Sequence, residues 1–104
     1  MRLQNKTVVI TGGSGALGQV VVPACVDAGA RVIVVDRHSR TAEAQGVRVM
    51  TADITNEADI RRLVEAILEE VGRIDALINL VGGFAMGSVL ETDLSLWQRM
   101  LTMN

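Results

Sequence analysis

The chain has 104 residues, of which 49% are hydrophobic, and its formal net charge at pH 7 is −2. This length allows a single domain with a modest core, and the hydrophobic content excludes a disordered chain. The charges are spread without a basic face, so we expect no nucleic-acid partner. No stretch approaches the about 20 apolar residues of a membrane span or resembles a signal peptide, so we expect a cytoplasmic protein without membrane contacts.

The first predicted element is a buried strand at residues 7–10. Val8, Val9 and Ile10 form an unbroken run of branched apolar residues. Such a run is typical of a parallel strand that is covered on both faces. The strand leads into a glycine-rich turn at residues 11–15.

Glycines 13, 15 and 18 satisfy the spacing G-x-G-x-x-G, and Gly12 precedes them. In this pattern, glycine permits a tight turn, close approach of backbone N–H groups to a pyrophosphate, and close packing of the following helix on the strand. We predict that helix at residues 16–28. A phosphate would lie at its N-terminus, where unpaired N–H groups and the helix dipole favour an anion.

Three further strands and two further helices are predicted along the chain. The strands are residues 31–36, 47–51 and 76–81, and the helices are residues 56–71, with Thr55 as N-cap, and 94–103. The alternation predicts a parallel sheet, because each crossover between parallel strands needs a connection such as a helix. Right-handed crossovers then give a Rossmann-type α/β fold with strand order 3-2-1-4 and helices on both faces.

Asp36 lies 18 residues beyond Gly18, at the carboxyl end of the second predicted strand. A carboxylate there can accept hydrogen bonds from both hydroxyls of an adenosine ribose. It should repel a 2′-phosphate at a cost of about 1 to 4 kcal/mol, although the adjacent Arg37 could pair with that phosphate. We therefore favour NAD(H) over NADP(H), with a turn or helix cap as the alternative role of Asp36. We expect His38 to be a solvated loop residue rather than a general acid.

Asp53 and Ile54 follow the third predicted strand at the same edge of the sheet. This position suits adenine recognition, with the carboxylate accepting from the exocyclic amine and Ile54 covering a ring face. The alternative is that Asp53 caps the helix region that begins near Thr55. After the fourth strand, Val81, Gly82 and residue 83 are small enough to let the backbone pass a ribose.

Together these residues resemble the short-chain dehydrogenase/reductase family. The matching positions are Thr11, Gly12, Gly15, Gly18, Asp36, Asp53, Ile54, Asn79, Gly82 and the segment 97–104. They span the whole chain and correspond to roughly the first half of a typical family member. The resemblance therefore implies a truncated Rossmann domain.

The resemblance also implies roles for individual residues. The residues facing the pyrophosphate would be Gly12, Ser14, Gly15, Ala16 and Leu17, and those lining the adenosine-side ribose would be Leu80, Val81 and Gly82. Asn79 would mainly steady the sheet. Asn104 falls at the position of the family's active-site Asn, which supports a proton-relay water.

The sequence departs from the family pattern at two motifs. Ala16 stands where glycine is commonest, which looks more like the extended branch or the dihydropteridine reductases, and Leu80-Val81 replaces Asn-Ala. The family's catalytic Ser, Tyr and Lys would lie beyond Asn104, and the chain contains no Tyr and one Lys, Lys6. Because carbonyl reduction needs a suitable proton donor, we expect an NAD(H)-binding domain with little or no dehydrogenase turnover.

The resemblance further implies that the edge at residues 76–81 and the helix at residues 94–103 lack their usual packing partners. Bare strand edges and exposed apolar surfaces usually mark interfaces, so we expect a homo-oligomer with a two-fold contact.

Three alternatives to this function stay open: an oxidoreductase whose active site is completed by oligomerisation, an S-adenosylmethionine-binding domain, and a fragment that folds but binds nothing.

Overall fold

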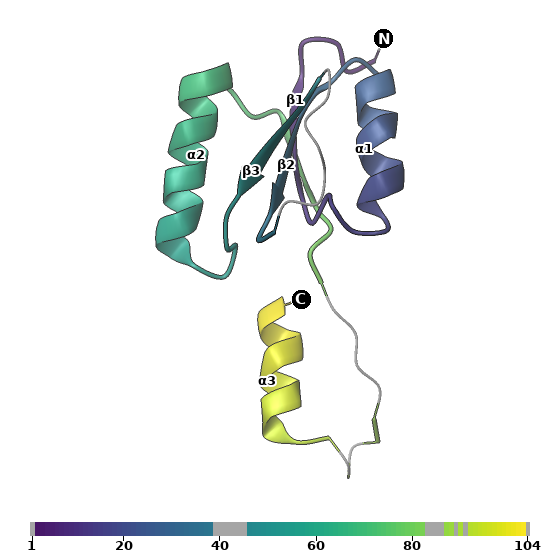
Figure 1. The fold of residues 1–104 in the computed structure, drawn as a ribbon, viewed down its shortest axis with the longest axis vertical. Coiled ribbons are helices and arrows are strands. Elements are labelled where there is room, and N and C mark those ends of the chain that lie inside the picture. The colour runs from purple at the N-terminus through teal and green to yellow at the C-terminus, as the bar shows by residue number, and fades with distance from the viewer. Residues whose placement is uncertain (1, 39–45, 83–86, 89, 91, 104) are drawn as a thin grey trace.

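The computed structural model describes residues 2–38, 46–82, 87, 88, 90 and 92–103. The elements are β1 (Thr7–Thr11), α1 (Gly18–Asp27), β2 (Arg31–Asp36), β3 (Val47–Thr51), α2 (Glu57–Val71), β4 (Ala76–Asn79) and α3 (Leu94–Met103). The four strands are parallel and lie in the order β3-β2-β1-β4. α1 covers one face of the sheet and α2 the other (Figure 1). The predicted α/β fold and its strand order are confirmed.

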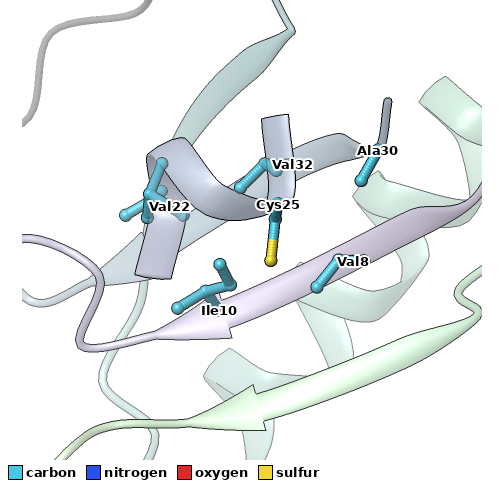
Figure 2. Close-up of a cluster of buried hydrophobic side chains, with 7 residues drawn as sticks. Val8, Ile10, Val22, Cys25, Ala30 and Val32 are labelled. Atoms are coloured by element: carbon cyan, nitrogen blue, oxygen red, sulfur yellow. The ribbon is translucent and has the colours of Figure 1, made fainter. Parts of the chain in front are cut away.

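The core has two layers, one on each face of the sheet. Val8 and Ile10 of β1 pack with Val22 and Cys25 of α1 (Figure 2). Val9, which lies between them in the sequence, belongs to a second cluster on the α2 side. Successive side chains of a strand point to opposite faces, so a strand covered on both faces needs apolar residues at every position. This requirement explains the unbroken apolar run of β1.

Five element boundaries differ from the sequence prediction by one or two residues. α1 ends at Asp27 instead of residue 28, and α2 begins at Glu57 instead of residue 56. β1 extends one residue further, to Thr11, and α1 begins at Gly18 instead of residue 16. β4 ends at Asn79 instead of residue 81. The Leu80 N–H still donates to the Thr11 carbonyl at 2.9 Å, so the chain leaves the ladder just after that bond. The turn before α1 is consequently longer than predicted.

The N-cap of α2 is Asn56, so the prediction of Thr55 was wrong. The Asn56 side chain accepts a hydrogen bond from the Asp59 N–H at 3.0 Å. The Thr55 hydroxyl instead donates to Asp53 at 2.6 Å. Because Asp53 engages that hydroxyl, the next residue with a suitable side-chain oxygen caps the helix. At its other end, α2 stops at Gly72, which adopts the left-handed conformation that glycine accommodates.

α3 stands apart from the sheet, beyond the carboxyl end of β4 (Figure 1). The radius of gyration is 15.6 Å and the longest dimension is 50 Å, whereas a compact chain of this length has a radius of gyration of about 13 Å. The separate position of α3 accounts for this elongation. Among the described helices, even the longest, with 15 residues, is too short to cross a bilayer.

Candidate functional site

Two glycines fix the turn between β1 and α1. Gly12 has a φ of +71°, and a Cβ placed on it would lie 2.8 Å from the Val81 nitrogen. A Cβ on Gly18 would lie 2.1 Å from the Gly13 carbonyl oxygen. Any larger residue at these two positions would push the end of β4 or the start of α1 away from the turn. The turn therefore holds the carboxyl ends of β1 and β4 and the N-terminus of α1 together.

Two backbone N–H groups just before α1 have no hydrogen-bond acceptor in the part of the chain that the structure describes. The Gly15 N–H donates to the Gly12 carbonyl at 3.1 Å, which closes the turn. Within the described part of the chain, the N–H groups of Ala16 and Leu17 make no hydrogen bond, and both residues are exposed. The first turn of α1 contains no acidic residue. This end of the helix can therefore receive an anion such as a phosphate.

Asp36 lies beside this turn at the carboxyl end of β2. Its Oδ2 accepts a hydrogen bond from the Ser14 N–H at 3.1 Å, and its Oδ1 accepts one from the Arg37 N–H at 3.2 Å. The side chain is half-buried. The predicted ribose-binding acid and the predicted phosphate turn are thus in direct contact.

A cleft of about 250 Å³ opens between the turn, the end of β2 and the segment after β4. It is lined by Gly12, Ser14, Gly15, Asp36, His38, Leu80, Val81 and Gly82. All but His38 were predicted as site residues. His38 is exposed, as expected, but it also lines the cleft. His38 could have been identified as a site residue from its position in the sequence, because it lies two residues after Asp36, where the chain crosses the edge of the sheet.

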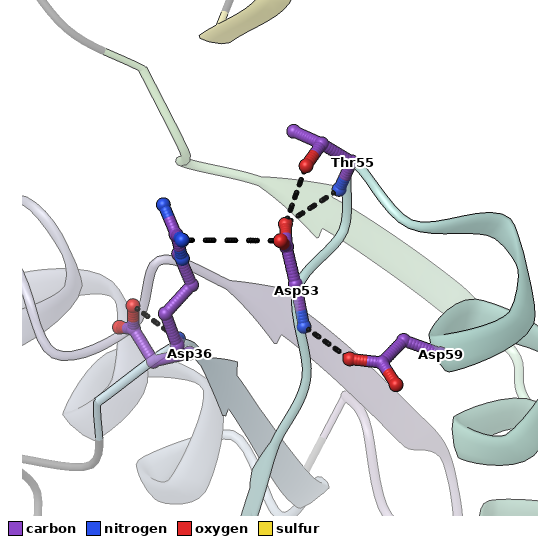
Figure 3. Close-up of polar contacts among 5 residues, drawn as sticks. Asp36, Asp53, Thr55 and Asp59 are labelled. Carbon is purple, nitrogen blue, oxygen red and sulfur yellow. Dashed lines mark hydrogen bonds and ion pairs between the residues drawn. The ribbon is translucent and has the colours of Figure 1, made fainter.

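Arg37 and Asp53 line a second, polar cleft of about 220 Å³, and His38 lines both clefts. The Asp53 Oδ1 accepts from the Thr55 N–H at 3.0 Å and from the Thr55 hydroxyl at 2.6 Å (Figure 3). The Asp53 N–H donates to Asp59 at 3.0 Å. The Thr55 hydrogen bonds, helped by the Arg37 charge, hold the pKa of Asp53 below its ordinary value. Asp53 is therefore a fixed anion at neutral pH.

Ile54 lies away from both of these clefts. It packs at the margin of the core cluster on the α2 side and lines an apolar groove between α2 and β4. Its predicted contact with an adenine ring is not favoured by this position and stays a prediction. The predicted roles of Asn104 and of residue 83 lie outside the described residues.

Asn79 joins two strands at the same edge of the sheet. Its Oδ1 accepts a hydrogen bond from the Thr11 hydroxyl at 3.1 Å, and the two residues are partners in the β1–β4 register. This bond is consistent with the sheet-steadying role that the resemblance implies. It keeps the carboxyl ends of the two strands that border the glycine turn in register.

A larger hollow of about 370 Å³ lies at the opposite, amino-terminal edge of the sheet. Asn5, Thr7, Arg31 and Arg73 contribute to its lining. Ligands of open α/β sheets bind at the carboxyl ends of the strands, and the glycine turn lies there too. The cleft beside the turn is therefore the better candidate. The Asp36 carboxylate lies in this cleft, and the N–H groups of Ala16 and Leu17 lie in the adjoining turn, so an acid suited to a ribose and donors suited to a phosphate are neighbours.

Known proteins match this chain over nearly its whole length. The family model described as short chain dehydrogenase matches residues 6–104. The 2-(S)-hydroxypropyl-CoM dehydrogenase 3 of Xanthobacter autotrophicus is 30% identical over an alignment covering 99% of this chain and 44% of the relative. The sorbitol dehydrogenase of Cereibacter sphaeroides is 32% identical, with 100% and 43% covered.

Solved structures show the same fold. A putative short-chain dehydrogenase/reductase from Burkholderia xenovorans superposes with a TM-score of 0.90 at 29% identity, covering 99% of this chain and 45% of that one. A short chain dehydrogenase from Leptospira borgpetersenii with bound NAD+ gives 0.87 at 26% identity, with 98% and 41% covered. The chain thus spans less than half the length of these relatives. It belongs to the short-chain dehydrogenase family and corresponds to the N-terminal part of the longer members.

Proposed function

We propose that this chain binds a nicotinamide dinucleotide in the cleft beside the glycine turn and prefers NAD(H) to NADP(H). The observation that carries the proposal is the hydrogen bond between the Ser14 N–H and the Asp36 carboxylate. This bond brings the acid that suits a ribose next to the backbone that suits a pyrophosphate. The bound NAD+ of the Leptospira relative supports the choice of cofactor class.

Two parts of the cofactor, the pyrophosphate and the adenosine ribose, have matching groups in the cleft or in the turn beside it. The N–H groups of Ala16 and Leu17 and the dipole of α1 would hold the pyrophosphate. The Asp36 carboxylate would accept the ribose hydroxyls. Leu80, Val81 and Gly82 line the side of the cleft that follows β4. The cofactor itself supplies hydride chemistry when bound.

Asp36 also provides the proposed cofactor preference. A 2′-phosphate on the adenosine ribose would bring a second negative charge near the carboxylate. Two like charges at about 4 Å repel by about 1 to 4 kcal/mol over dielectrics from water to protein surface, which corresponds to about five- to a thousandfold in affinity. NADP(H) should therefore bind more weakly than NAD(H).

We expect the chain by itself to bind the cofactor without ordinary dehydrogenase turnover. Its 104 residues contain no tyrosine. The sole lysine, Lys6, precedes β1 at the edge of the sheet opposite the cleft. A tyrosine acid with a neighbouring lysine is therefore not available within these residues to protonate a carbonyl.

Calorimetric titration of the wild type and of Asp36→Ala with NADH and NADPH tests the binding proposal. We expect the wild type to bind NADH more tightly than NADPH. Asp36→Ala should weaken NADH binding and reduce the difference between the two cofactors. Ala24→Asp, an exposed change on α1 away from the cleft, serves as the control. Equal, weak binding of both cofactors by the wild type would contradict the proposed preference.

We also propose that the chain self-associates through the β4 edge and α3. β4 is the last strand on its side of the described sheet, and Leu77 on it is 58% exposed. An apolar groove of about 290 Å³ between β4 and α2 lies beside this strand. α3 exposes Leu94, Trp97 and Leu101. A second copy offers the same apolar surfaces, which supports a two-fold contact.

A further inference from the structure

We infer that the ion pair between Arg37 and Asp53 holds the Arg37 guanidinium away from an adenosine 2′-phosphate and thereby strengthens the preference for NAD(H). The inference rests on the proposed cofactor site and adds a second element of specificity to Asp36. It assigns Asp53 a positioning role that differs from contact with adenine.

Arg37 is the group that would otherwise oppose the effect of Asp36. It directly follows Asp36, and its side chain is 70% exposed. A guanidinium matches the charge and the geometry of a phosphate. Placed over the ribose, it would offset the repulsion between Asp36 and a 2′-phosphate. The direction of the Arg37 side chain therefore matters for specificity.

The structure directs Arg37 into the polar cleft that contains Asp53. One terminal nitrogen of the guanidinium lies 3.9 Å from the Asp53 Oδ2 (Figure 3). Arg37 and Asp53 line this polar cleft, and Asp36 does not. Asp36 lines the cleft beside the glycine turn, and Arg37 does not. Adjacent residues of the chain thus serve two different clefts.

Asp53 is well suited to hold a guanidinium because its own position is fixed. Thr55 donates two hydrogen bonds to Oδ1, which leaves Oδ2 toward Arg37. The Asp53 N–H is held by Asp59. Asp59 pairs with Arg62 at 2.7 Å through its other oxygen, so Arg62 has its own carboxylate. The acceptor for Arg37 is preorganised.

The expected size of the effect follows from the exposure of the pair. Exposed ion pairs contribute modestly, so releasing Arg37 should change the ratio of the two dissociation constants by about two- to fivefold. Asp53→Asn removes the charge and keeps an oxygen for the Thr55 hydrogen bonds. It should lower the ratio of the NADPH to the NADH dissociation constant by that factor.

A double-mutant cycle tests the inference. The dissociation constants of NADH and NADPH are measured by cofactor fluorescence for the wild type, Asp53→Asn, Arg37→Ala and the double variant, with circular dichroism as a check of folding. In the Arg37→Ala background, Asp53→Asn should leave the ratio unchanged. Glu57→Gln, which removes a charge that pairs with Arg61 on α2, is the control. Asp53→Ala replaces Asp53→Asn if the latter does not fold.

Two results would overturn the inference alone. One is that the wild type and Asp53→Asn both bind NADH and have the same ratio of the NADPH to the NADH dissociation constant. The other is an equal drop of the ratio with and without Arg37, because that drop would come from direct repulsion by Asp53. Failure of the wild type to bind NADH would instead overturn the proposed site, and this inference with it.

Discussion

The Asp36 carboxylate and the Ser14 N–H join the acid after β2 to the glycine turn after β1. The spacing of glycines and the place of Asp36 at a strand end could be read from the sequence. The contact between them depends on the parallel register that aligns Thr11 with Val35. Such a register is set by tertiary packing, so the contact could not be predicted.

The Arg37–Asp53 pair was beyond sequence reasoning for a similar reason. Arg37 follows the end of β2, and Asp53 lies just beyond the end of β3. These two strands are neighbours, with Asp36 opposite Thr51. Either residue could have faced the cofactor cleft. The hydrogen bonds from Thr55, which fix the Asp53 side chain, decide the arrangement.

Asp75 provides a test of residue-level electrostatics away from the cleft. Its carboxylate accepts the Thr7 N–H at 2.7 Å and pairs with Arg73. These contacts, the Thr7 bond first, lower the pKa of Asp75. A lowered folded-state pKa gives stability that is complete above the unfolded-state pKa, near pH 4, and is lost as the pH falls through the folded-state pKa.

We therefore expect acid to destabilise the wild type more than Asp75→Asn. The variant should be less stable at neutral pH, because the charged acceptor is absent, and its free energy of unfolding should fall less below about pH 4. Urea denaturation at a series of pH values measures both quantities. The same loss of stability on acidification in both proteins would contradict the prediction.

At the scale of elements, apolar patterning was enough to predict the four strands and three helices in the correct order. Branched apolar runs marked the central strands, and helical spacing marked α2 and α3. Element ends were harder, because they depend on which polar groups compete for the same partner. Thr55 and Asn56 are both good N-caps, and only the engagement of Thr55 by Asp53 selects Asn56.

α3 is the element whose position the sequence could not predict. Helices of about ten residues are marginal in water without tertiary contacts, and α3 has ten residues. Leu94, Trp97 and Leu101 fall at spacings of three and four, which places them on one face of the helix. This face remains exposed in the structure. We therefore expect α3 to be stabilised by a partner surface.

At the scale of the whole molecule, self-association should supply that surface. Sedimentation velocity should show the wild type as an oligomer at micromolar concentration. Replacing both Trp97 and Leu101 by serine should shift it toward monomer, because the apolar face of α3 is removed. Ser95→Glu changes an exposed polar residue of the same helix and keeps Trp97 and Leu101, so it serves as the control. A monomeric wild type, or a variant that associates as strongly as the wild type, would contradict the proposal.

The location of cofactor binding is the central claim, and backbone amide NMR with NADH tests it most directly. We predict that titration shifts the N–H signals of Ser14, Ala16, Leu17 and Gly82 at the cleft beside the glycine turn. The signals of Asn5 and Arg73, at the hollow on the opposite edge of the sheet, should stay unchanged. Shifts confined to that opposite hollow, or no shifts at millimolar NADH, would contradict the proposed function.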